Sequence, residues 1–159
     1  MAFTEVVLYA PDEAVQMQVG KQLAEAVKAP LTLYLQGDLG AGKTTLVRGF
    51  LRALGHQGAV RSPTYTLMEP YAELIPACYH FDLYRLCDPG ELEYLGVRDL
   101  LGSPVVLLFE WPERAVGELP TADVLICIST QDTGRQVHVQ AQTEQGQSMC
   151  NCLEKSKGS

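Results

Sequence analysis

Eight consecutive residues, 37–44, read Gly-Asp-Leu-Gly-Ala-Gly-Lys-Thr and match the pattern G-x-x-x-x-G-K-[ST]. Backbone N–H groups of such a loop surround a phosphate, and glycine allows the close approach and the unusual backbone conformations that this needs. The spacing directs Lys43 to the β- and γ-phosphates and places the Thr44 hydroxyl to ligate Mg²⁺. We therefore expect this chain to bind a nucleoside triphosphate together with Mg²⁺.

The residues on either side of this loop have the pattern of a strand and a helix. The apolar run at residues 31–35 predicts a strand, and the loop is followed by apolar residues at helical spacing, namely Leu46, Val47, Phe50, Leu51 and Leu54. A true phosphate loop requires this strand–loop–helix context. The positive end of the helix should face the anion.

A carboxylate at the end of a neighbouring strand should complete the Mg²⁺ site, because a metal bound to phosphate and water needs only one or two protein oxygens. Glu110 ends the apolar run 105–109, which predicts a central strand covered on both faces. Asp82, in the expected strand 77–83, is the second candidate. Two alternatives remain open: a solvated acid at a strand end for Glu110, and a surface ion pair between Asp82 and Arg85.

Three further residues could contact a nucleotide. Ser62 and Thr64 flank Pro63 in a turn whose hydroxyls could sense the γ-phosphate, although such a turn could simply join a helix to a strand. Trp111 follows Glu110, and on physical grounds a packing role fits it better than a ligand contact.

Length and composition indicate one globular domain, since the chain has 159 residues and 47% hydrophobic content. We expect residues 1–143 to form this single P-loop domain and residues 144–159 to form a polar tail that could be mobile. Additional strands are expected at residues 6–9 and 65–69, and as an edge hairpin at 122–129 and 136–142. Helices are expected after Asp12, from Asp88 toward Leu95, and over 97–101.

The net charge of −7 and the pI near 4.9 disfavour binding of nucleic acid without a partner. No apolar run approaches the ~18 residues of a membrane span, and the first residues lack the basic start of a secretory signal, so we expect a cytoplasmic protein without a membrane partner. Five cysteines without a Cys-x-x-Cys pair indicate neither a disulfide framework nor a zinc site.

Four segments, at residues 37–45, 62–67, 80–85 and 110–112, occur in the order seen in the TsaE family, the small ATPases of tRNA threonylcarbamoyladenosine biosynthesis. The chain resembles this family from about residue 5 to about residue 140. The resemblance implies a phosphate-loop NTPase-like three-layer α/β fold, with a central parallel sheet extended by antiparallel strands and helices on both faces. It also implies ATP or ADP with Mg²⁺ as cofactors and TsaD and TsaB as protein partners. Slow, partner-stimulated hydrolysis would reset the complex between rounds of modification, and tRNA would be met only through the complex.

Residue by residue, Lys43, Thr44 and Thr45 match the family's phosphate and Mg²⁺ contacts. Asp82, Glu110 and Trp111 match positions that the family requires for function, and residues 62–64 match its loop near the γ-phosphate. The catalytic candidates are therefore Lys43, Asp82 and Glu110, and the metal candidates are Thr44, Glu110 and Asp82. The expected nucleotide contacts are Asp38, Leu39, Gly40, Ala41, Gly42, Lys43, Thr44, Thr45, Ser62, Thr64 and Trp111.

Other nucleotide-binding classes fit less well. A GTPase would need an Asn-Lys-x-Asp segment, which the sequence lacks, and the Asp-x-x-Gly match at residues 99–102 precedes the apolar strand instead of following it. A small-molecule kinase would close an Arg-bearing lid over the phosphates, and no such insertion is evident. A non-catalytic scaffold switched by nucleotide remains a third hypothesis, which only a turnover measurement separates from an ATPase.

Overall fold

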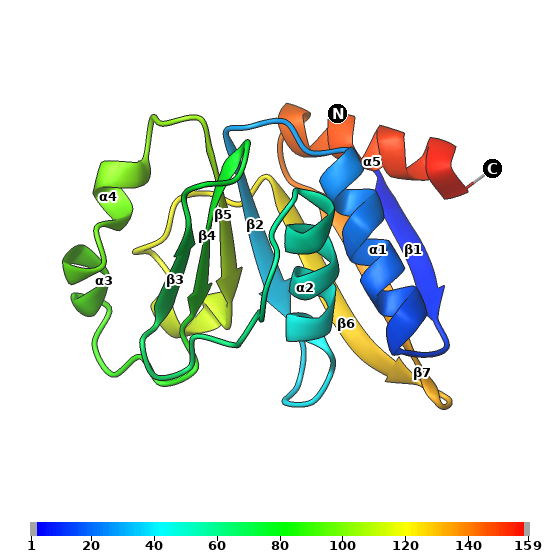
Figure 1. The fold of residues 1–159 in the computed structure, drawn as a ribbon, viewed down its shortest axis with the longest axis horizontal. Helices are drawn as coiled ribbons and strands as arrows, with labels where there is room; N and C mark the ends of the chain where they lie inside the picture. The colour runs from blue at the N-terminus through cyan, green and yellow to red at the C-terminus, as the bar shows by residue number, and fades with distance from the viewer. Residues whose placement is uncertain (1–2, 158–159) are drawn as a thin grey trace.

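The computed structural model describes residues 3–157, which form one sheet of seven strands with helices on both of its faces (Figure 1). The strand order is β1-β7-β6-β2-β5-β4-β3. The strands are β1 (Glu5–Ala10), β2 (Leu31–Gln36), β3 (Met68–Tyr71), β4 (Ala77–Asp82), β5 (Val105–Glu110), β6 (Val124–Gln131) and β7 (Gly134–Ala141). The helices are α1 (Glu13–Glu25), α2 (Lys43–Ala53), α3 (Glu91–Tyr94), α4 (Val97–Leu100), the 3₁₀ helix η1 (Pro112–Ala115) and α5 (Glu144–Lys157).

The four central strands, β6, β2, β5 and β4, run parallel, whereas β7, β1 and β3 add to the sheet in antiparallel fashion. This confirms the fold class expected from the sequence. In the parallel register Leu35 of β2 pairs with Glu110 of β5, and Asp82 of β4 pairs with the same Glu110. Both candidate acids therefore lie at the carboxyl edge of the sheet, where β2 runs into the phosphate loop.

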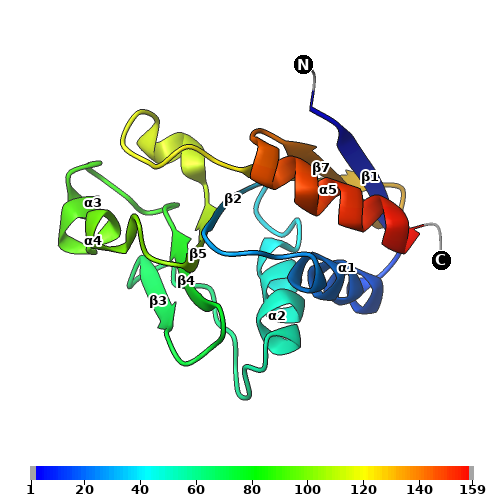
Figure 2. The ribbon, with the colours of Figure 1, turned by 90° about the horizontal axis from the view of Figure 1, so that it is seen from above.

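Strand β5 is covered on both faces, as its apolar run predicts, and all six of its residues are buried. Val106 and Leu108 belong to the larger core that α1, α2 and α5 complete. Val105, Leu107 and Phe109 point to the opposite face and pack with residues of α3, α4 and η1. Figure 2 shows from above the helices α1, α2 and α5 of the larger core and the short helices α3 and α4 of the smaller one. The acid that ends β5 thus extends from a strand that is buried on both faces of the sheet.

Three expected elements differ from the structure. The hairpin of β6 and β7 lies inside the sheet, because the N-terminal strand β1 pairs with β7 and takes the edge position. The alternation at residues 65–69 belongs mostly to a turn, since Leu67 adopts a positive φ of 68° and its N–H bonds to the Pro63 carbonyl at 2.7 Å. The helix expected from Asp88 begins only at Glu91, because the Asp88 carboxylate accepts the Gly90 N–H in a preceding turn.

The polar tail expected after residue 143 is instead the helix α5. Its buried apolar side chains, Met149, Cys150 and Leu153, recur on one helical face and join the larger core beside β7. Glu144 in the first turn complements the helix dipole. Among the helices within residues 3–157, none combines the length and apolar character needed to cross a bilayer.

Candidate functional site

The phosphate loop, residues 37–42, connects β2 to α2 and borders a hollow of about 600 Å³. Gly42 immediately precedes α2 with a positive φ of 94°, and a Cβ at this position would overlap the side chain of Gln16. Only glycine fits both requirements. Apart from Asp38, every residue predicted to contact nucleotide lines the hollow, as do Asp82 and Glu110. Their roles in binding and catalysis stay predictions.

Lys43 is buried at 6% exposure and its ammonium group stays close to its own loop. Its Nζ donates to the Gly37 carbonyl and, at 3.3 Å, to the Asp38 carbonyl. It also lies 4.1 Å from the centroid of the Trp111 ring, in cation–π geometry. Burial lowers the pKa of Lys43, while the negative charges of Glu110 and other acids oppose this change. The loop's cation is thus held at the border of the hollow.

Trp111 packs against the protein core on one side and also lines the hollow. The packing role inferred from its residue type is therefore only part of its environment. Its ring lies 5.0 Å from that of Tyr84, and it is packed against the core cluster around Phe109. Its φ of 59° is unusual for a bulky residue. Backbone strain of this kind is concentrated at functional sites.

Glu110 has 2% exposure although it borders the hollow, so it is not the solvated strand-end acid that the sequence left open. Its Oε2 lies 2.6 Å from Nε2 of His80, which is fully buried on β4. Nδ1 of His80 has no hydrogen-bond partner among the described residues. Because Oε2 is a hydrogen-bond acceptor when the acid is ionised, the geometry fits a proton on Nε2 of His80.

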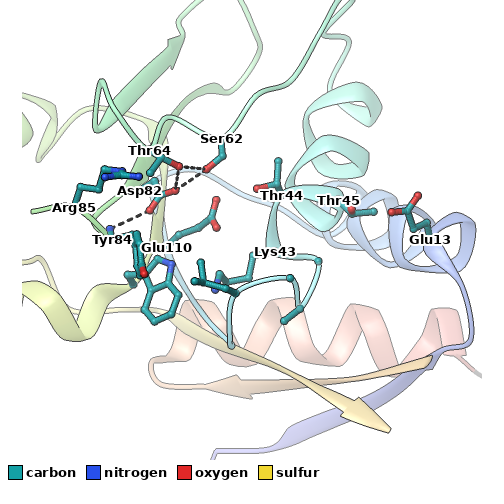
Figure 3. A pocket seen from close by; sticks show the side chains of 15 residues that line it. Glu13, Lys43, Thr44, Thr45, Ser62, Thr64, Asp82, Tyr84, Arg85 and Glu110 are labelled. Carbon is teal, nitrogen blue, oxygen red and sulfur yellow. Dashed lines mark hydrogen bonds between the residues drawn. The ribbon is translucent and has the colours of Figure 1, made fainter. Parts of the chain in front are cut away.

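Asp82 organises the turn at residues 62–64. Its Oδ2 accepts hydrogen bonds from the hydroxyls of Ser62 at 2.6 Å and Thr64 at 3.0 Å, and its Oδ1 accepts the Tyr84 N–H at 3.0 Å (Figure 3). Arg85 instead lies over the ring of Tyr65, 4.6 Å from its centroid, so the surface ion pair with Asp82 does not form. These three donors leave one lone pair, on Oδ1, for direct metal ligation by Asp82.

The residues around the hollow fit a Mg²⁺ ion bound together with phosphate. Thr44 supplies a hydroxyl and Glu110 a carboxylate, both oxygen donors of the kind that Mg²⁺ prefers. Within residues 3–157 no group of three or more His, Cys, Asp or Glu side chains could hold a metal by itself. A Mg²⁺ ion that keeps water and phosphate oxygens as ligands needs no such group.

The structure adds residues that the sequence analysis did not name as site residues. Glu13, Tyr84 and Arg85 also line the hollow. Tyr84 and Arg85 lie within the quoted segment 80–85, which could have indicated them. Glu13 also borders a second hollow of about 180 Å³, which Arg135 lines as well. No local pattern could have indicated Glu13 or Arg135.

Comparisons with known proteins agree on one family. The profile described as "Threonylcarbamoyl adenosine biosynthesis protein TsaE" matches residues 10–137. Proteins named "tRNA threonylcarbamoyladenosine biosynthesis protein TsaE" are similar to the chain, including one from Haemophilus influenzae that is 47% identical over 150 residues, covering 91% of this chain and 95% of the relative. The Synechocystis protein is 43% identical over 120 residues, covering 71% and 73%, respectively. The crystal structure of Bacillus subtilis YdiB superimposes with a TM-score of 0.85 at 26% identity and covers 99% of both chains.

Proposed function

Because this chain belongs to the TsaE family, we propose that it binds ATP with Mg²⁺ beside the phosphate loop and hydrolyses it slowly in support of tRNA threonylcarbamoyladenosine synthesis. One observation carries this proposal. Lys43 and Thr44 at the start of α2 and Glu110 at the end of β5 border the same hollow at the carboxyl edge of the sheet. Ligands of open α/β sheets bind at this edge.

The proposed reaction is attack of a water oxygen on the γ-phosphorus. The new P–O bond forms as the bond to the β–γ bridging oxygen breaks, and ADP and inorganic phosphate leave. Lys43 and the loop N–H groups stabilise negative charge on the phosphate oxygens. Thr44 and Glu110 would hold Mg²⁺, which when bound neutralises the charge that develops on the leaving oxygen. Asp82 holds the hydroxyls of Ser62 and Thr64 at the border of the hollow, where they would contact the γ-phosphate.

We further propose that protein partners, TsaD and TsaB, complete the site. The side chains of Leu39 and Arg85 at its border are exposed, so the hollow is open to solvent. An open site leaves water in place and weakens electrostatic stabilisation of the transition state. Hydrolysis by the isolated protein should therefore be very slow. The net charge of −7 also gives the chain little means of binding tRNA alone.

Reconstitution of tRNA modification tests this function. With TsaD and TsaB, the wild-type protein should support many rounds of modification, whereas Lys43→Ala should allow about one round before the reaction stalls, in keeping with a release step that limits turnover. Lys21→Ala, which removes an exposed lysine on α1, is the matched control and should behave like the wild type. Equal multiple-turnover modification without this protein would overturn the proposal. Multiple turnover with Lys43→Ala and no measurable ATP hydrolysis by any variant would favour a scaffold.

A further inference from the structure

Gln16 lies beneath the phosphate loop, although neither the loop pattern nor the family motifs include it. It is on α1 and has 3% exposure. Its Nε2 donates to the carbonyl oxygen of Gly42 at 2.8 Å and to that of Ala41 at 3.3 Å. The loop therefore rests on a buried donor from a helix that precedes it in the chain.

The position of Gln16 is set by the unusually close packing of α1 against α2. A Cβ on Gly20 of α1 would overlap the carbonyl oxygen of Leu46, and a Cβ on Gly49 of α2 would overlap that of Met17. The two backbones are thus in direct contact at two points. Because Gln16 is four residues before Gly20, it lies one turn earlier on the same helical face, directly below the start of α2.

The two hydrogen bonds fix the direction of two consecutive peptide groups. In a trans peptide the carbonyl and the following N–H point in opposite directions, and the loop contains no cis bond. Since the carbonyls of Ala41 and Gly42 face Gln16, the N–H groups of Gly42 and Lys43 face away from it. Both of these residues line the larger hollow, where the phosphates would bind.

A second side chain supports the same loop from the sheet. Nε of Arg135 donates to the Ala41 carbonyl at 3.2 Å, and its Nη2 donates to that of Gly40 at 3.3 Å. The Ala41 carbonyl thus accepts bonds from both Arg135 and Gln16. Of these two donors, Gln16 is the more deeply buried, and only Gln16 reaches the Gly42 carbonyl, which also accepts the Leu46 N–H of α2 at 3.1 Å and precedes the Lys43 N–H.

We propose that Gln16 is a positioning residue that orients the Gly42 and Lys43 N–H groups toward the phosphate before nucleotide binds. This inference rests on the proposed nucleotide-binding function. A loop that is already oriented loses less freedom on binding, which increases affinity. The N–H groups contact the nucleotide in the ground state and in the transition state alike, so their orientation should affect KM more than kcat.

The test compares two substitutions of Gln16 with a matched control. Gln16→Met keeps the length of the side chain but removes the donor, and Gln16→Glu keeps its shape but replaces the donor by an acceptor that repels both the carbonyls and the phosphate. Gln18→Met makes the first substitution at an exposed position of the same helix. Calorimetry with Mg·ADP measures Kd, thermal unfolding without nucleotide measures folding, and the partner-stimulated ATPase assay measures KM and kcat.

We expect Gln16→Met to raise Kd and KM by about tenfold while kcat stays within about twofold, because the Ala41 and Gly42 carbonyls each lose the hydrogen bond from the buried Gln16 amide and keep only one other donor. Gln16→Glu should raise Kd by about 100-fold, since a negative charge is added below the anion. Gln18→Met should match the wild type. The inference fails if both Gln16 variants, folded at the assay temperature, bind Mg·ADP like Gln18→Met, or if a Gln16 variant lowers kcat with KM unchanged. Absence of Mg·ADP binding by the wild type would instead overturn the proposed function and this inference with it.

Discussion

Replacement of Lys43 by methionine removes the positive charge of the phosphate loop and keeps most of its packing. In the free protein the lysine stem is buried, and its ammonium lies over Trp111 and against loop carbonyls. Methionine is of similar length and can keep the apolar contact with the indole. The substitution therefore tests the charge with less disturbance of the loop than Lys43→Ala.

The expected loss of binding free energy follows from the contacts that the Lys43 ammonium makes and gives up when nucleotide binds. Two charge-assisted hydrogen bonds to phosphate oxygens contribute about 4 kcal/mol. The cation–π contact with Trp111, worth about 1 kcal/mol, is given up when the ammonium moves to the phosphate. About 3 kcal/mol then remains, which corresponds to a Kd for Mg·ADP about 100-fold higher in Lys43→Met than in the wild type.

Isothermal calorimetry with Mg·ADP measures this difference directly, and thermal unfolding without nucleotide shows whether the variant is folded. Lys21→Met, at an exposed position of α1, is the control for the same chemical change. A folded Lys43→Met protein whose Kd stays within about threefold of the wild type would refute the assignment of Lys43 as a phosphate ligand, because loss of its charge-assisted hydrogen bonds should raise Kd about 100-fold.

Three other predictions concern the acid, the indole and a buried thiol. Glu110→Gln should bind Mg·ADP within about tenfold of the wild type but lose partner-stimulated hydrolysis, because Mg²⁺ matters most where charge shifts in the transition state; normal turnover would exclude Glu110 as the metal acid. Trp111 is the only tryptophan and contacts Lys43, so saturating Mg·ADP should change intrinsic fluorescence in the wild type, and an unchanged spectrum would contradict the site geometry. Burial raises the pKa of the Cys78 thiol from 9.0 to about 12, so its contribution to the free energy of unfolding should be complete below pH 9 and be lost between pH 9 and 12. Urea unfolding at pH 8 and pH 10.5 should show a smaller decline in Cys78→Ala, and an equal decline would exclude this cause.

Local sequence patterns were sufficient to predict those elements and site residues that depend only on residues close together in the chain. The apolar run of β5 predicted both its burial and the position of Glu110, because a parallel strand covered on both faces has no polar side. The phosphate loop was predictable because its glycines and its lysine act within one short segment. The same kind of reasoning misread residues 65–69, because alternation of polar and apolar side chains also occurs in an irregular turn.

Long-range contacts account for what the sequence could not indicate. Gln16 bonds to a carbonyl 26 residues further along the chain, and no spacing rule connects a helix side chain to a loop at that separation. The helix α5 has only a narrow apolar face, and its burial depends on the surface that β7 and β1 present to it. The edge position of β1 is likewise set by its pairing with β7 and not by its own composition.

The pairing of the first strand with the last has a consequence for the order in which the chain folds during its synthesis. Glu5 of β1 pairs with Gln140 of β7, so the earliest strand made has no partner in the sheet until almost all of the chain has been translated. The phosphate loop and the parallel strands β2, β4 and β5 are made well before that point and can pair with one another first. Closing loops this long is slow compared with local folding. The edge strand and α5 should therefore join the core last, after the nascent chain has left the ribosome.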